Sequence, residues 1–237
     1  ESCQYLQLYI IDLKGGLEAI DFKNAPNVKI IKTMQDAVTL LSQVDKEMKD
    51  RFDFLEENSF KGIIPGRDKK ERIVVAVDEA SVLYMNRSRY DDDYASAMKA
   101  RKLADSISKL SRAAAVHLIL ATQKLDKQVI PTSVSENISG RMAFRANSFQ
   151  GSMVVLGSKD AFDLPEIPGR GIWSVGNRKV IVQAPFIKDE EIKNCCKQIK
   201  NEFQAGKRKL FNPMIGEVEK QETKETQESF DKNNFKE

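Results

Sequence analysis

Short apolar runs that alternate with long helical patterns constrain the fold of this chain more than any other feature. The runs at 5–11, 28–31, 73–77 and 116–121 are rich in residues that favour strands. The run IVVAV at 73–77 has charges on both sides, which is typical of a strand buried on both faces. Alternation of such strands with helices predicts an α/β domain with a mostly parallel sheet.

Helical patterns occupy the segments between these runs. Thr33 is expected to start a helix, with Asp36 three residues later as an approximate capping box, and apolar residues recur at helical spacing through about residue 57. A second long helix is expected at about 94–115. The remaining expectations are a helix near 132–138, a strand at 141–146, a helix around 150–163, a hairpin over GIWSV and KVIVQA, and a helix at about 188–205.

The composition is that of a globular protein with a charged surface. The chain has 237 residues, of which 41% are hydrophobic and 31% charged, and no apolar run reaches 18 residues, so no membrane span is expected. The net charge of +3 is too balanced to indicate a nucleic-acid binder by itself. The single histidine, His117, lies in an apolar run and is expected in the core. Residues 217–237 are rich in Glu, Lys, Gln and Asn and predict a disordered tail.

Two adjacent carboxylates, Asp78 and Glu79, follow the run at 73–77. Ligands of open α/β sheets bind at the carboxyl ends of the strands. In that position Asp78 would hold the Mg²⁺ shell of a nucleotide, and Glu79 would orient and polarise the water that attacks the γ-phosphate. The alternative for this motif alone is a strand that ends in two solvated acids.

A second polar pair, Thr122 and Gln123, follows the run at 116–121. A neutral amide beside a γ-phosphate helps to place the attacking water, although by itself this pair is also how an ordinary loop begins. The sequence contains no G-x-x-x-x-G-K-[ST] loop, which cradles phosphates in many nucleotide-binding proteins. This chain alone is therefore not expected to bind ATP tightly or to hydrolyse it.

Several strings occur in a fixed order: DLKGGLE at 12–18, EMKDR at 47–51, IVVAVDEA at 73–80, LSRAAAVHLILATQ at 110–123, NISGRMAFR at 137–145 and PGRG at 168–171. Together they resemble the FtsK/SpoIIIE family of DNA-translocating ATPases, from residue 5 to about residue 187. The resemblance implies a RecA-like P-loop NTPase core whose Walker A loop and strand lie outside this sequence. It divides the chain into a partial motor domain at 1–187, a C-terminal helix and extension at 188–216, and the tail at 217–237.

The resemblance also implies roles for individual residues. Those implied to act are Glu79, Gln123 and Arg141 in catalysis, and Asp78, Thr122 and Arg170 in the binding of ATP and Mg²⁺, with Asp78 reaching the metal through water. Arg141 matches an arginine that ring motors present to the nucleotide of a neighbouring subunit, where it stabilises charge on the transferring phosphoryl group. Arg145 is a weaker candidate for that role. The alternative for each arginine is a solvated or salt-bridged surface residue.

Basic residues accumulate on the helix expected at 94–115, against the single acid Asp105: Lys99, Arg101, Lys102, Lys109 and Arg112. Neutralising phosphates requires such charges on one face. The matching region of the family lies toward the pore, so the resemblance implies contacts with the backbone of double-stranded DNA. A solvated helix face is the alternative.

For the whole protein the resemblance implies a ring-forming, hexameric, ATP-driven translocase of double-stranded DNA at the cytoplasmic face of the bacterial membrane, with its anchor outside this sequence. The strings DLKGG, PGRGIW and VQAPF look most like versions encoded by conjugative elements, and chromosome-partitioning members are close. One alternative is an FtsK/SpoIIIE-like ATPase domain of a type VII secretion system, which moves proteins. Another is a remnant that does not hydrolyse ATP and only binds a partner ring.

Overall fold

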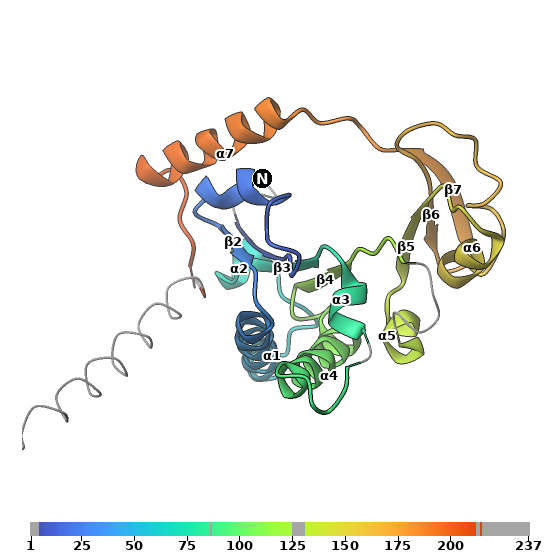
Figure 1. Cartoon of the computed structure of the whole chain (residues 1–237). Coiled ribbons are helices and arrows are strands. Elements are labelled where there is room, and N and C mark those ends of the chain that lie inside the picture. The colour runs from blue at the N-terminus through green and yellow to red at the C-terminus, as the bar shows by residue number, and fades with distance from the viewer. Residues whose placement is uncertain (1–4, 86, 125–130, 212–213, 215–237) are drawn as a thin grey trace, which may run out of the picture.

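Two sheets organise the protein in the computed structural model, which describes residues 5–85, 87–124, 131–211 and 214 (Figure 1). The larger sheet is parallel, in the order β2-β1-β3-β4, with β1 at Leu6–Ile11, β2 at Val28–Ile31, β3 at Arg72–Val77 and β4 at Val116–Leu120. The smaller sheet is antiparallel, in the order β5-β6-β7, with β5 at Gly140–Phe144, β6 at Arg170–Val175 and β7 at Arg178–Gln183. The predicted α/β class with a mostly parallel sheet is confirmed.

Helices α1 (Met34–Glu57) and α4 (Tyr94–Leu110) cover one face of the parallel sheet (Figure 1). The side chain of Thr33 accepts a hydrogen bond from the Asp36 amide, which satisfies an unpaired donor of the first turn and confirms the predicted start of α1. The apolar stripe of α1 packs against the side chains of β1 and β3 that point to this face, and its members include Val38, Leu41, Val44 and Met48. Burial of this stripe stabilises the helix on the sheet.

The opposite face of the parallel sheet is less completely covered. The short 3-10 helix η2 (Ile20–Asn24) packs against β2 and against α7 (Asp189–Gln204) at one side of the sheet. Val74 and Ala76 of β3, which point to this face, are only half-buried. The run at 73–77 is therefore fully buried on one face and not on both, as its composition had suggested.

Strand β4 is an edge strand within the described part of the chain, although its composition predicts a buried one. Val116 is buried, whereas His117 is exposed and Ile119 is 53% exposed. The expectation that His117 lies in the core is wrong. Its pKa is lowered, by partial burial and by Arg72 nearby, so the imidazole is neutral at pH 7.

The second long helix ends at Leu110, five residues before the predicted end, because tertiary hydrogen bonds capture the carbonyls that would continue it. Ala113 accepts from the Ile63 amide, Ala114 from the Arg51 guanidinium and Ala115 from the Ile73 amide. Ala115 adopts a left-handed conformation, with φ of 54°, before β4 begins. These contacts override the high helix propensity of the alanines.

Shorter helices complete the fold: α2 at Pro65–Asp68, α3 at Ala80–Tyr84, α5 at Thr132–Asn137 and α6 at Phe149–Leu156. The helix predicted around 150–163 is α6 and ends where Gly157 turns left-handed, with φ of 65°. Among the described residues, no helix combines the length and the apolar content needed to cross a lipid bilayer. The predicted tail at 217–237 lies outside the described residues.

A buried polar cluster lies at the amino end of the parallel sheet. Arg51 is 1% exposed and donates hydrogen bonds to the carbonyls of Glu71 (2.7 Å) and Ala114 (2.8 Å). The Phe211 amide donates to the carboxylate of Glu71, and the Phe211 ring stacks on Tyr5 with 5.4 Å between the ring centroids. The segment that follows α7 is thereby joined to the start of β1.

Candidate functional site

The carboxyl ends of three neighbouring strands meet at one edge of the parallel sheet. Beyond the strands themselves, the amide of Asp78 donates to the carbonyl of Ile11 (3.0 Å) and the amide of Ala121 donates to the carbonyl of Val77 (2.9 Å). These bonds keep the residues that follow β1, β3 and β4 side by side. This parallel register places the pair Asp78 and Glu79 next to the pair Thr122 and Gln123, as the sequence predicts.

Glu79 is the centre of this edge, and its side chain is only 5% exposed. One carboxylate oxygen accepts from the Ser81 amide (3.1 Å) and from the Thr122 hydroxyl (2.5 Å). The other accepts from the Gln123 amide (3.1 Å) and from the ammonium of Lys14 (3.4 Å). A carboxylate offers about four acceptor sites, so the four donors occupy all of them.

These contacts determine the charge of Glu79. Burial by itself raises the pKa of a carboxyl group, but hydrogen bonds from Thr122, Ser81 and Gln123 outweigh it and lower the pKa of Glu79 to about 2. The side chain is therefore an anion at neutral pH. Such a group orients a water molecule by accepting its hydrogen, and it is too weak a base to remove the proton before attack begins.

Thr122 and Gln123 act on Glu79 in different ways. The hydroxyl of Thr122 donates to the carboxylate, so its role in the structure is to position Glu79. Gln123 uses its backbone amide for this contact, and its side chain is exposed at the same edge. The amide group of Gln123 is thus available to a bound ligand.

Asp78 is the residue that the sequence predicts to reach a metal ion through water. It lies next to Glu79, and it is half-buried at the end of β3. Among the described residues, no group of three or more His, Cys, Asp or Glu side chains is arranged to hold a metal ion by itself. One carboxylate supplied through water fits a Mg²⁺ ion whose other ligands are phosphates and water.

Sequence reasoning missed Lys14 and Asp12, which follow β1 at the same edge. The Asp12 carboxylate, 4% exposed as a residue, accepts from the Lys14 amide (2.9 Å) and shapes the turn that brings Lys14 to Glu79. The string DLKGG directly after the run at 5–11 was the available signal, because carboxyl ends of parallel strands share an edge.

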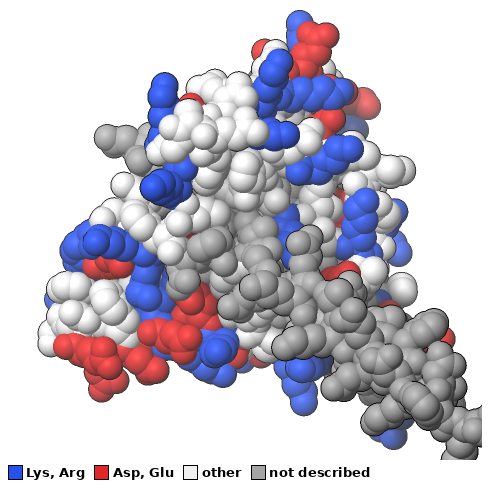
Figure 2. Space-filling model, turned by 90° about the vertical axis from the view of Figure 1, so that its left-hand side faces the viewer, with Lys and Arg blue, Asp and Glu red and all other residues white. Residues whose placement is uncertain are grey.

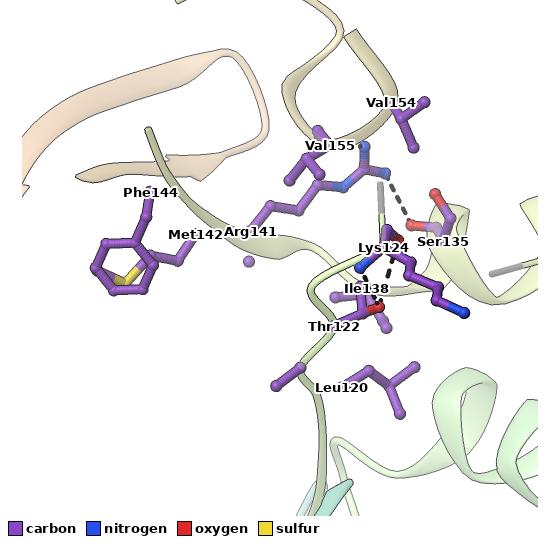
Figure 3. A pocket seen from close by; sticks show the side chains of 12 residues that line it. Leu120, Thr122, Lys124, Ser135, Ile138, Arg141, Met142, Phe144, Val154 and Val155 are labelled. Carbon is purple, nitrogen blue, oxygen red and sulfur yellow. Dashed lines mark hydrogen bonds between the residues drawn. The ribbon is translucent and has the colours of Figure 1, made fainter. Parts of the chain in front are cut away.

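Arg141 lies beside this edge, in a pocket of about 270 Å³ between the end of β4 and strand β5 (Figure 3). Thr122 lines the same pocket, so the pocket reaches a residue that contacts Glu79. The guanidinium of Arg141 points away from Met142 and donates to the carbonyls of Val155 (3.2 Å) and Ser135 (2.8 Å). Both partners belong to the same chain.

Two other arginines lie away from the pocket lining. Arg170 donates to the side-chain oxygen of Gln183 on the neighbouring strand β7 (2.9 Å). Arg145 forms a 3.8 Å ion pair with Glu166, whose side chain is 88% exposed. The structure therefore brings Arg141 close to the candidate site and does not bring Arg145 or Arg170 to it.

Helix α4 presents three exposed basic residues, Lys99, Lys102 and Lys109, and Arg112 is exposed in the turn that follows the helix. Lys109 forms an ion pair with Asp105 (2.7 Å). Arg101 differs from these, because its guanidinium donates to the carbonyls of Leu83 and Met85 and joins α4 to the segment after α3. On the face of the molecule in Figure 2, basic side chains are interspersed with acidic ones, so no single sign of charge dominates it.

The chain is similar to two groups of curated proteins. It is 27% identical over 212 residues to the DNA translocase FtsK of Streptococcus pyogenes, and this match covers 81% of the chain and 24% of the relative. It is 25% identical over 202 residues to the ESX-4 secretion system protein EccC4 of Mycobacterium tuberculosis, and this match covers 78% of the chain and 16% of the relative. The chain thus spans a quarter or less of the length of these relatives. No protein-family model matches it.

Among solved structures, the conjugation coupling protein TcpA of pCW3, in a monomer form with ATPγS, superposes with a TM-score of 0.76 at 26% identity. The match covers 83% of this chain and 57% of TcpA. The strand ends that carry Glu79 and Thr122 lie within a fold that this ATPγS-bound protein shares. By sequence and by fold, the chain is FtsK/SpoIIIE-like, with a RecA-like α/β core.

Proposed function

We propose that this chain is part of the motor domain of an ATP-driven translocase of double-stranded DNA, acting in conjugative DNA transfer or chromosome partitioning. The observation that carries the proposal is the Glu79 carboxylate, held as an anion by donors from two neighbouring strand ends, with Asp78 beside it. The relatives support it, because they include a protein named DNA translocase FtsK and a conjugation coupling protein with ATPγS.

In this proposal the reaction is the hydrolysis of ATP. Glu79 accepts a hydrogen from the attacking water and orients its oxygen toward the γ-phosphorus, and the side chain of Gln123 contacts the γ-phosphate. Asp78 holds the Mg²⁺ shell through water, and the metal supplies positive charge for the phosphate oxygens. Thr122 keeps Glu79 in position for this step.

The phosphate-binding loop itself is proposed to come from a strand that is not among those described. Strands β4 and β5 each have one edge without a described neighbour, and the pocket of about 270 Å³ lies between the end of β4 and β5. An unpaired strand edge is a template for another strand. The exposed Ile119 and His117 on β4 also favour a covering element at this place.

A ring, hexameric in form, is the proposed assembly, attached to the cytoplasmic face of the bacterial membrane through an anchor outside this sequence. Arg141 is proposed to approach the nucleotide of a neighbouring subunit, and this requires its guanidinium to leave the carbonyls of Val155 and Ser135. Arg170 lies away from the candidate site and donates to Gln183, so no role in nucleotide binding is proposed for it. The exposed basic residues of α4 are proposed to contact the DNA backbone.

A second function, protein transport by a type VII secretion system, is favoured by the similarity to EccC4. The two functions differ in the ligand that stimulates the ATPase. Duplex DNA accelerates hydrolysis by a DNA translocase, whereas a secretion ATPase responds to its protein substrate. Stimulation of the full-length protein by duplex DNA therefore distinguishes them.

The proposal is tested by Glu79→Gln in the full-length protein that contains this sequence. The variant is expected to bind ATP with wild-type affinity and to lose DNA-stimulated hydrolysis by about 100-fold or more, since the group that orients the water is gone. The matched control is Glu166→Gln, because Glu166 is an exposed acid in the loop between α6 and β6. Unchanged hydrolysis in Glu79→Gln would contradict the proposal.

A further inference from the structure

One of the four donors to Glu79 differs from the other three in its freedom to move. The amides of Ser81 and Gln123 belong to the backbone, and the Thr122 hydroxyl makes a short bond at 2.5 Å. Lys14 instead reaches Glu79 with the end of a long side chain that is 52% exposed, at 3.4 Å. Of the four contacts, this one is broken with the least rearrangement.

The backbone of Lys14 is nevertheless fixed in place. Its amide donates to Asp12, and the next two residues, Gly15 and Gly16, have φ of 118° and 70°. These conformations favour glycine, and the side chain of Lys32 passes so close to Gly16 that a Cβ there would lie 2.5 Å from it. The turn therefore holds the ammonium group within reach of Glu79, while about half of the side chain is exposed to solvent.

We infer that Lys14 is a positioning residue that occupies the last acceptor site of Glu79 and must release it before hydrolysis. With all four sites filled, the carboxylate cannot accept a hydrogen from water. Departure of the ammonium frees one lone pair of Oε2 for that water. The inference rests on the proposed function and adds to it a residue that restrains the reaction.

The step that follows release is an ordinary hydrolysis. The water oxygen forms a bond to the γ-phosphorus, and the bond from that phosphorus to the bridging oxygen breaks and leaves ADP. Glu79 accepts a hydrogen bond from the attacking water, and the proton that the water loses ends on the inorganic phosphate. Lys14 takes no part in these bond changes, and its effect is on the fraction of molecules in which Glu79 is free to act.

The experiment measures ATP hydrolysis by the full-length protein with and without duplex DNA. Lys14→Met keeps the length of the side chain and removes the donor, so hydrolysis without DNA is expected to rise about two- to fivefold, the range for an ion pair with one half-exposed partner. Lys14→Arg restores a donor and is expected to return the rate toward that of the wild type. Lys32→Met, which alters a lysine packed on the same turn, is the matched control and is expected to behave as wild type.

A double variant tests whether Lys14 acts through Glu79. Lys14→Met is expected to leave the residual rate and the ATP affinity of Glu79→Gln unchanged, whereas a residue that binds phosphate directly would lower that affinity. An unchanged or lower rate in Lys14→Met alone overturns the inference, provided that the wild type hydrolyses ATP. Failure of the wild type to hydrolyse ATP overturns the proposed function and the inference with it.

Discussion

The hydroxyl of Thr122 lies 2.5 Å from a carboxylate oxygen of Glu79 and joins the ends of two neighbouring strands across 43 residues of sequence. The bond gives Glu79 one orientation at the edge of the sheet. It also contributes to the low pKa of the carboxyl group.

Thr122→Val removes this bond and keeps the shape of the side chain. A hydrogen bond to a charged group contributes about 1.5–3 kcal/mol, so the free energy of unfolding is expected to fall by an amount in this range, and ATP turnover is expected to fall about tenfold. Urea unfolding and steady-state kinetics measure the two effects. Thr122→Ser retains the hydroxyl. An equally large loss of stability and turnover in this variant would show that the hydrogen bond to Glu79 is not the cause.

The depressed pKa of Glu79 predicts how stability depends on pH. Its folded-state pKa of about 2 lies below the ordinary value of 4.5, so the stabilisation is complete above pH 4.5 and is lost as the pH falls toward 2. The shift corresponds to about 3 kcal/mol at most. Urea unfolding across this range is expected to show a steeper loss in the wild type than in Glu79→Gln. Glu166→Gln, at an exposed site, is expected to follow the wild type.

Arg51 is expected to be the arginine whose loss destabilises the fold most. Arg51→Met leaves two buried carbonyls, those of Glu71 and Ala114, without their donor, and the free energy of unfolding is expected to fall by about 3 kcal/mol or more. Chemical denaturation measures the change. Arg112→Met is the exposed counterpart and is expected to stay within about 0.5 kcal/mol of the wild type.

A mixing experiment with Arg141→Ala tests whether Arg141 acts on the nucleotide of its own subunit or on that of a neighbouring subunit. Subunits with Arg141→Ala are mixed with subunits that lack a working Walker A loop, and ATP hydrolysis is measured at several ratios. If Arg141 completes the site of a neighbour, the activity is expected to depart from the sum of the two populations. Simple additivity would show that Arg141 acts within its own chain, where its carbonyl partners lie.

The exposed lysines of α4, if they contact DNA as proposed, predict a salt-dependent affinity for duplex DNA. Each phosphate contact contributes about 0.9 to the slope of log affinity against log salt concentration, so Lys99→Gln with Lys102→Gln is expected to reduce that slope by about 2. Fluorescence anisotropy of the full-length protein measures it. Lys193→Gln with Lys197→Gln on α7 is the control pair, and an equal reduction there would argue against a specific role for α4.

The parallel strands and the edge that carries Glu79 could be predicted because their signals are local. Apolar runs mark the strands, and polar residues directly after two of them mark the edge. Lys14 was missed because its importance depends on the turn made by Asp12, Gly15 and Gly16, which only the fold reveals.

The predicted end of α4 and the predicted burial of β4 were wrong for the same physical reason. Composition does not show which residues, distant in sequence, a segment will contact. The alanines at 113–115 favour a helix, but their carbonyls are taken by Ile63, Arg51 and Ile73. His117 and Ile119 belong to an apolar strand, but that strand lies at an edge of the described sheet. In both cases residues distant in sequence decide the outcome.

The stacking of Tyr5 on Phe211 has a practical consequence. This contact lies at the amino end of β1, and a strand of this length is about 20 Å long, so Phe211 is separated from the edge that carries Glu79 by roughly the length of the strand. A fluorophore coupled beside Phe211 would therefore lie far from Glu79 and leave the contacts of that carboxylate undisturbed.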